Sequence, residues 1–144
     1  MKKIIVLVTI YFMVSLTATA SKPAALGIQE LDMKAFKEKV WNLDKNKIFL
    51  REGKLPIILD FSATWCAPCK RIKPHLLVLQ QKYNGKLFIY EIDVDQFPEL
   101  AQRFKVEGMP TLIFIPNNNS FKSLLGYKEY NELDAAVNSL FFKK

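Results

Sequence analysis

Stretches of strand length alternate along this chain with stretches whose apolar positions follow helical spacing. Residues 56–62 read Pro-Ile-Ile-Leu-Asp-Phe-Ser, a nearly continuous apolar run that is typical of a strand buried on both faces of a sheet. Asp60 is the only charge in this run, and it needs an explanation because burying a lone carboxylate is unfavourable. Further strands are predicted at residues 28–31, 86–94, 111–115 and 121–125, the last two separated by the turn residues 117–119.

Four segments carry apolar residues three and four positions apart, which is the spacing of an amphipathic helix. The predicted helices span residues 33–43, 66–83, 98–104 and 130–142. Asp32 precedes the first as a helix cap, and Pro74 lies inside the second, where a proline is expected to kink the helix. Residues 44–54 form a polar loop whose apolar triplet, residues 48–50, is expected to tuck against the body of the domain.

The order of these elements is β-α-β-α-β-α-β-β-α. Alternating units followed by a hairpin and a closing helix predict an α/β fold, a central mixed β-sheet flanked by helices on both faces. The length of 144 residues suits one domain, and a chain that is half hydrophobic can bury a core. We therefore expect a single domain over residues 28–144.

The first twenty residues have a different pattern from the rest. Lys2 and Lys3 precede the apolar run 4–16, and Ala18-Thr19-Ala20 is the small-x-small pattern of a signal-peptidase site. This pattern predicts a signal peptide over residues 1–20, cleaved after Ala20, and a flexible leader over residues 21–27. An uncleaved membrane anchor facing the periplasm is the alternative, although the run is short for a membrane span. Export to an oxidising compartment, the bacterial periplasm, follows from the first interpretation.

The charge of the chain points away from nucleic acid. The formal net charge is +7, and removing residues 1–20 takes away two lysines and no acid. The remaining basic residues are scattered and often stand beside acids, whereas a nucleic-acid surface gathers them on one face with aromatics. We read the charge as a solvated surface suited to acidic partners.

Both cysteines of the chain lie in one short motif, "TWCAPCK" at residues 64–70. A structural zinc site needs four ligands, and two cysteines with one histidine cannot supply them in a monomer. Covalent haem attachment needs a histidine after the second cysteine, and that position holds Lys70. A purely structural disulfide would constrain the unfolded chain little, because the loop it closes is so short. That bridge remains an alternative to redox chemistry, which the surroundings favour.

Cys66 stands where a buried strand ends and a helix begins. Free backbone N–H groups and the helix dipole at that point favour a thiolate. Cys69 follows one helical turn later within bridging reach, and Pro68 is well tolerated so early in a helix. We expect Cys66 to be the exposed nucleophile and Cys69 the more buried resolving thiol, with no metal and no cofactor beyond the dithiol.

The segment "LDFSATWCAPCKRIKP" resembles the active-site segment of the thioredoxin family, and the resemblance covers roughly residues 28–142. Its markers are Asp60, Trp65, Pro74, the "GMPT" run 108–111 and Gly126. The resemblance implies a thioredoxin fold and a protein thiol–disulfide oxidoreductase. It also implies that Pro110 is a cis-proline packed against the dithiol, and that Asp60 accepts a proton from Cys69.

The resemblance further implies a flat apolar docking patch for substrates. The residues of this docking patch are Trp65, Ala67, Pro68, Val106, Met109 and Gly126. The backbone of Met109 is expected to pair with an extended substrate segment, a contact that reads shape more than sequence.

Three residues depart from the family pattern. Glu91 stands where the family carries a lysine near the buried aspartate, Ser62 replaces a common tryptophan, and Ala67 replaces the commoner glycine. A second carboxylate would raise the pKa of Asp60 further unless a lysine neutralises the pair. Lys70 and Lys73 either add positive potential near Cys66 or form a solvated helix face.

The resulting hypothesis is an exported thioredoxin that acts as a monomer on disulfide-containing protein substrates. Its electrons are expected to come from a membrane thiol carrier, and the x-Pro form of the motif favours a reductant. The alternatives are a periplasmic disulfide oxidase or isomerase, a thioredoxin of cytochrome maturation, and a non-redox binding module that uses the Trp65 and Met109 surface.

Overall fold

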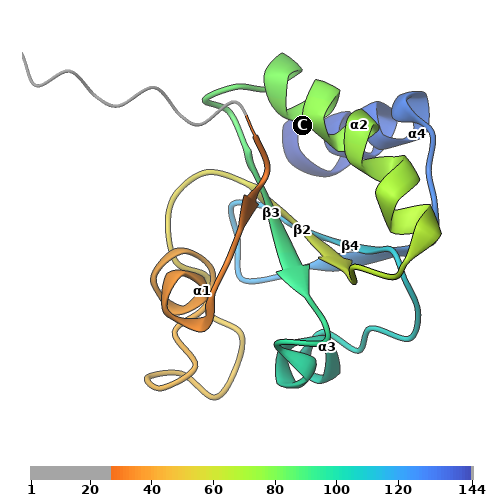
Figure 1. The fold of residues 1–144 in the computed structure, drawn as a ribbon. Coiled ribbons are helices and arrows are strands. Elements are labelled where there is room, and N and C mark those ends of the chain that lie inside the picture. The colour runs from red at the N-terminus through yellow and green to blue at the C-terminus, as the bar shows by residue number, and fades with distance from the viewer. Residues whose placement is uncertain (1–26, 144) are drawn as a thin grey trace, which may run out of the picture.

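A five-stranded mixed sheet, in the order β1-β3-β2-β4-β5, forms the centre of the computed structural model (Figure 1). The structure describes residues 27–143, so the predicted signal peptide 1–20 and all but the last residue of the predicted leader 21–27 lie outside the described residues. The elements are β1 (Gln29–Glu30), α1 (Met33–Lys39), β2 (Ile57–Ser62), α2 (Ala67–Lys82), β3 (Phe88–Asp93), α3 (Pro98–Arg103), β4 (Thr111–Ile115), β5 (Lys122–Leu125), α4 (Tyr130–Val137) and the π-helical turn η1 (Asn138–Phe142). β2 pairs parallel with β3 and antiparallel with β4, which confirms the predicted mixed sheet.

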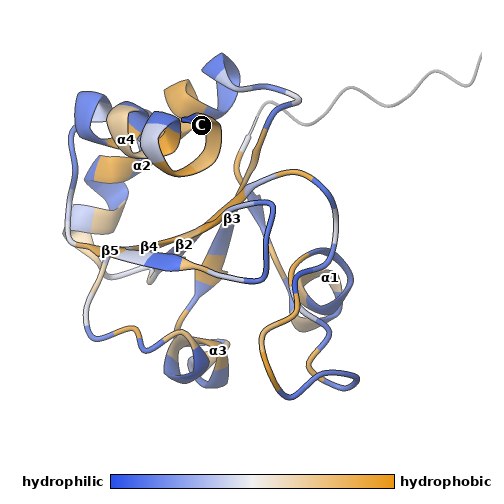
Figure 2. Ribbon diagram, turned by 180° about the vertical axis from the view of Figure 1, so that it is seen from behind, coloured by the Kyte–Doolittle hydropathy of each residue, from blue (hydrophilic) through white to orange (hydrophobic). Residues whose placement is uncertain are grey.

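Helices cover both faces of this sheet. α1 and α3 lie on one face and α2 and α4 on the other (Figure 1), and the apolar strands β2 and β4 run between the two layers (Figure 2). Side chains alternate along a strand, so Leu59 and Phe61 of β2 pack on the α1 side while Ile58 packs on the α2 side. The same alternation directs Asp60 toward the layer of α2, whose first turn carries the cysteines.

An aromatic cluster around Phe104 holds the layer of α1 and α3 together. Its ring lies between 5.0 and 6.3 Å, centroid to centroid, from the rings of Phe36, Trp41, Phe49, Phe61 and Phe121. Through Phe49 this cluster fixes the predicted loop 44–54. The prediction for the whole triplet 48–50 was wrong, because Ile48 is 81% exposed and Leu50 is also exposed. Successive side chains of an extended loop point in different directions, so only the middle one reaches the core.

Two helices end earlier than their apolar spacing predicts. α1 ends at Lys39 instead of residue 43, because Trp41 turns into the aromatic cluster and its backbone forms a β-bridge with Arg51. The closing helix is regular only to Val137 and continues as the π-helical η1. Within residues 27–143, none of the helices combines the length and apolarity needed to cross a membrane.

Candidate active site

The two cysteines meet at the start of α2, directly after the central strand. Cys66 is the N-cap of α2, and its Sγ accepts a hydrogen bond from the backbone N–H of Cys69 at 3.3 Å. The two residues form a disulfide with an S–S distance of 2.05 Å and a Cα–Cα distance of 5.3 Å. Pro68 occupies the first turn, where the missing N–H removes no helix hydrogen bond. A backbone N–H group that has no partner within the helix therefore points at the leading sulfur, as the sequence predicts.

Exposure does not separate the two cysteines. Cys66 and Cys69 are each 4% exposed, so the prediction of an exposed Cys66 and a buried Cys69 was wrong for this disulfide form. A ring closed over so few residues keeps both cysteines in one buried cluster with Ala63, against which Val94 and Met109 pack. The two differ in backbone position, since Cys66 caps the helix and Cys69 lies within it.

The loop before β4 packs against the dithiol. The peptide bond between Met109 and Pro110 is cis, as the family resemblance implied, and Pro110 is buried. Thr111 Oγ1 donates a 2.6 Å hydrogen bond to the carbonyl of Gly108, and the N–H of Gly126 donates a 2.8 Å bond to the carbonyl of Pro110. These bonds tie the loop to the start of β4 and to the end of β5.

Several of the residues predicted for the docking patch lie at or beside the dithiol. Trp65 is 66% exposed beside Cys66, Ala67 is exposed, and Met109 packs from the loop before β4 against the cluster that contains both cysteines. Val106 instead packs against the core of α1 and α3. Asp95 was not predicted from the sequence to take part, yet its Oδ2 accepts a 2.8 Å hydrogen bond from the indole Nε1 of Trp65.

Asp60 lies on the central strand β2, on the face that α2 covers, and is 2% exposed. Among the described residues its Oδ1 has no hydrogen-bond partner. Burial raises the pKa of Asp60 to about 7, and the neighbouring Glu91 raises it while Lys73 lowers it. A carboxyl group that titrates near neutrality can exchange protons with a thiol at working pH.

Glu91 is the register partner of Asp60 on the parallel strand β3. Its two oxygens are both occupied: Ser62 Oγ donates to Oε1 at 2.8 Å, and Lys73 Nζ donates to Oε2 at 2.6 Å. A lysine that could neutralise the two carboxyl groups was expected from the sequence. Lys73 of α2 is the lysine that pairs with Glu91. The sequence held one signal for it, since Lys73 follows Cys69 by four residues and so shares its helix face.

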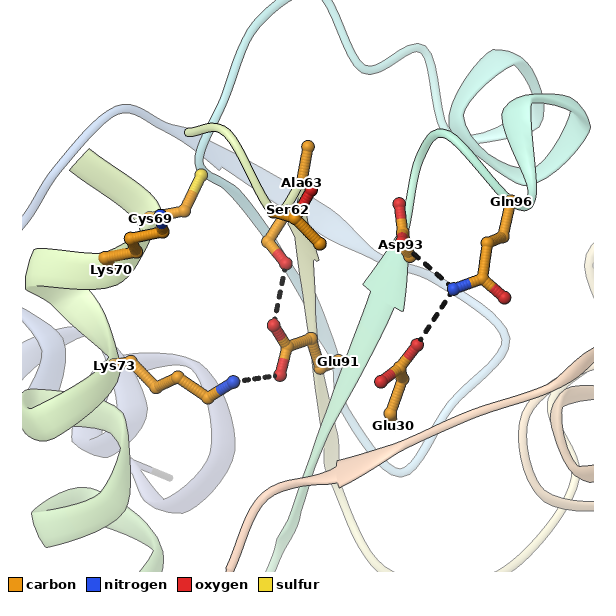
Figure 3. A pocket seen from close by; sticks show the side chains of 10 residues that line it. Glu30, Ser62, Ala63, Cys69, Lys70, Lys73, Glu91, Asp93 and Gln96 are labelled. Carbon is orange, nitrogen blue, oxygen red and sulfur yellow. Dashed lines mark hydrogen bonds and ion pairs between the residues drawn. The ribbon is translucent and has the colours of Figure 1, made fainter. Parts of the chain in front are cut away.

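A pocket of about 350 Å³ opens between α2 and β3, beside Cys69 (Figure 3). Lys73 reaches across it to Glu91, and at its other end Gln96 Nε2 bridges Asp93 and Glu30 at 3.0 and 3.3 Å (Figure 3). Within residues 27–143, no group of three or more histidine, cysteine, aspartate or glutamate side chains is placed to hold a metal ion.

The cysteine pair starts a helix directly after a buried strand that carries a carboxyl group, and the loop with the cis-proline packs against it. This arrangement is that of a thiol–disulfide oxidoreductase site on a mixed α/β sheet. The model of the thioredoxin family matches residues 28–139, and this chain belongs to that family. It is a protein thiol–disulfide oxidoreductase; the family acts on disulfide-containing proteins and uses the dithiol without a cofactor.

Individual relatives agree with this assignment. The thioredoxin of Borreliella burgdorferi is 29% identical over 117 residues, which cover 81% of this chain and 97% of the relative. Thioredoxin-1 of Drosophila melanogaster is 45% identical over 74 residues, or 51% of this chain and 69% of the relative. The crystal structure of oxidised mitochondrial thioredoxin 3 from Saccharomyces cerevisiae superimposes with a TM-score of 0.60 at 29% identity, covering 78% of this chain and 95% of that chain.

Proposed function

We propose that this protein is an exported thioredoxin that reduces or exchanges disulfides in other exported proteins. The pattern of residues 1–20 supports export through a cleaved signal peptide, and the periplasm is the compartment that fits it. The Ala-Pro pair between the cysteines keeps the x-Pro form that favours a reductant. A membrane thiol carrier supplies the electrons, and the protein acts as a monomer.

The reaction begins with the reduced dithiol. The Cys66 thiolate attacks one sulfur of a substrate disulfide, and the other substrate sulfur leaves as a thiolate that takes a proton from water. The Cys69 thiol then gives its proton to Asp60 and attacks Cys66 Sγ, which forms the Cys66–Cys69 disulfide. The second substrate sulfur leaves as a thiolate and is protonated in turn. Two electrons pass to the substrate, and a dithiol donor returns the enzyme disulfide to the dithiol.

The contact between Cys69 N–H and Cys66 Sγ is the observation that supports this order of attack. The donated hydrogen bond and the positive end of α2 both favour negative charge on Cys66 Sγ, at 3.3 Å from the amide. Cys69 has no such position, because it lies inside α2 and does not cap the helix. Cys66 is accordingly the first nucleophile and Cys69 the resolving thiol.

The docking patch brings the substrate disulfide to Cys66. In the part of the chain that the structure describes, the backbone N–H and carbonyl of Met109 form no hydrogen bond. They are available to an extended substrate segment, as in strand addition to a sheet edge. Trp65, Ala67, Pro68 and Gly126 supply apolar area around that contact.

Reduction of a protein disulfide such as that of insulin tests the activity, with wild type, Cys66→Ser and Cys69→Ser side by side. Both variants are expected to lose turnover, and Cys69→Ser is expected to accumulate a mixed disulfide with its substrates. Full activity of Cys66→Ser would overturn the proposal. A double variant lacking both sulfurs that retained the biological role would instead favour a binding module.

The reduction potential decides between reductant and oxidant. A reduction potential near that of thioredoxin, about −270 mV, supports the proposal. A potential near that of strongly oxidising proteins with a dithiol, about −120 mV, supports the oxidase alternative. Amino-terminal sequencing of the protein from a periplasmic fraction tests export, since a chain beginning at Ser21 is expected.

A further inference from the structure

The carboxyl ends of three parallel strands share one edge of the sheet, and the dithiol follows the strand in the middle. β3 runs parallel to β2, and β5 does so too because β4 is antiparallel to both β2 and β5. In the sheet order β3-β2-β4-β5, Asp95 follows β3 on one side of the cysteines and Gly126 follows β5 on the other. The docking patch therefore spans this edge between an Asp95 end and a Gly126 end.

Lys128 places a positive charge at the Gly126 end. A Cβ atom placed on Gly126 would lie 3.9 Å from the Nζ of Lys128. That Nζ donates hydrogen bonds of 3.2 and 3.1 Å to the carbonyls of Leu125 and Tyr127. These bonds hold the ammonium group against the turn that carries Gly126. An ammonium group has three N–H donors, so one remains for a ligand.

Arg71 brings a second positive charge from α2. It follows Ala67 by four residues and Pro68 by three, so it shares the helix face of these docking-patch residues. Its Cζ lies 4.9 Å from the ring centroid of Tyr127, the residue after the glycine. The ring is held in turn, because its OH donates a 2.9 Å hydrogen bond to Glu129 Oε1. Stacking on a ring orients a guanidinium group and leaves its N–H edge available to a carboxylate.

The carboxylates that follow this turn are engaged in other contacts. Glu129 accepts the Tyr127 hydroxyl and caps the first turn of α4, and Glu132 accepts the backbone N–H of Glu129 at 2.9 Å. Within residues 27–143, neither Arg71 nor Lys128 forms an ion pair with a carboxylate. The Gly126 end therefore presents two cations that an incoming carboxylate can pair with.

We propose that the preferred substrates carry an acidic side chain close to the disulfide cysteine, on the side that faces Gly126, where Arg71 and Lys128 bind its carboxylate. This inference rests on the proposed function and names its substrate class, extended protein segments with an acidic residue beside the cysteine. The segment pairs through its backbone with Met109, in the loop before β4. At the other end the carboxylate of Asp95 repels an acidic side chain, so the site reads charge on one side of the cysteine.

The expected preference is modest because both cations are exposed to solvent. An exposed ion pair strengthens binding by up to about fivefold, and salt screens it. Both cations are held in place before a substrate arrives, which reduces the entropy lost on binding. The substrate preference should therefore be measurable at low salt and nearly absent at high salt.

The test uses single-cysteine peptides whose sulfur carries nitrothiobenzoate. The Cys66 thiolate attacks the peptide sulfur, and the aromatic thiolate leaves and is detected by its colour. Glutamate or glutamine stands on the amino or the carboxyl side of the cysteine. For one of the two sides, the glutamate peptide is expected to react about fivefold faster than the glutamine peptide at low salt, and about equally fast at about 0.5 M salt.

Two double variants separate charge from structure. Arg71→Gln/Lys128→Gln is expected to lose the preference for glutamate, whereas Arg71→Lys/Lys128→Arg keeps both charges and should retain it. Lys122→Gln is the matched control for the single variant Lys128→Gln. It also removes one exposed lysine, but from the start of β5, four residues before Gly126. Its preference is expected to match wild type.

Equal rates of wild type with the glutamate and glutamine peptides would overturn the inference. So would the same preference on both sides of the cysteine, or equal losses in Lys122→Gln and Lys128→Gln, because net charge alone would then explain the attraction. Wild-type protein that reduces no protein disulfide, insulin included, would instead overturn the proposed function. The peptide reaction would still report on the charge preference, since it needs only one attack by Cys66.

Discussion

The indole Nε1 of Trp65 donates a 2.8 Å hydrogen bond to Asp95 Oδ2, which joins the residue before the first cysteine to the turn after β3. Trp65 is 66% exposed, so packing alone does not hold its ring. The hydrogen bond therefore orients a large apolar surface beside the dithiol before any substrate arrives. Such preorganisation lowers the entropy lost when a substrate binds.

Asp95→Ala is accordingly expected to raise the KM for protein disulfide substrates while kcat changes little. Loss of one hydrogen bond, worth about 1 kcal/mol, corresponds to an increase of about fivefold. Asp95→Asn keeps an acceptor oxygen and serves as the control, with a KM near wild type. An unchanged KM for Asp95→Ala in steady-state assays would show that the ring orientation does not matter for docking.

Asp60→Asn is expected to stabilise the oxidised protein at pH 8 by up to about 4 kcal/mol. Folding raises the pKa of Asp60 to about 7. Between about pH 4 and pH 7, Asp60 is therefore protonated in the folded protein and ionised in the unfolded chain. Stability from this group is therefore fully present at low pH and is lost as the pH rises through that window. The asparagine stays neutral, so the gain should vanish below pH 4.

Urea unfolding of both proteins at pH 4 and pH 8 measures this difference. The exposed Glu107→Gln is the control and is expected to change the free energy of unfolding by less than about 0.5 kcal/mol at either pH. A gain for Asp60→Asn that was equal at the two pH values would argue against a titrating Asp60.

Reduction of the disulfide is expected to lower the free energy of unfolding by about 2 kcal/mol, because the bridge closes a loop of only four residues in the unfolded chain. Urea unfolding with and without a dithiol reductant tests this expectation. The double variant Cys66→Ser/Cys69→Ser provides the baseline and should be insensitive to the reductant. A much larger loss on reduction would mean that the sulfurs also hold the surrounding loops together.

Phe104→Ala is expected to destabilise the domain by roughly 3–5 kcal/mol, because its fully buried ring contacts five aromatic neighbours. The reduction potential of the surviving folded protein should not change, since the cluster lies across the sheet from α2. Phe88→Ala, which removes a half-exposed ring, should cost much less. Similar losses for both variants would contradict the assignment of the cluster as the main support of that layer.

Much of the site could be predicted from local sequence because its parts are adjacent in the chain. The run from Asp60 through Cys69 places a buried strand, a turn and a helix start in order, and the two cysteines fall within one helical turn. The mixed sheet and its helix layers follow from the same periodicities. The early end of α1 could not be predicted, since Trp41 leaves the helix to meet Phe104, more than sixty residues away in sequence.

The sequence by itself determined the elements, the dithiol at a helix start and a carboxyl group on the strand beneath it, because these depend on local spacing and on which residues avoid water. The family resemblance already placed Glu91 near Asp60, and the strand register confirms it. Only the tertiary structure decided that Lys73 pairs with Glu91 and that Asp95 holds Trp65. These contacts depend on strand register and on the side-chain directions of separate elements. Neither can be read from one segment, because pairing is settled by packing across the sheet.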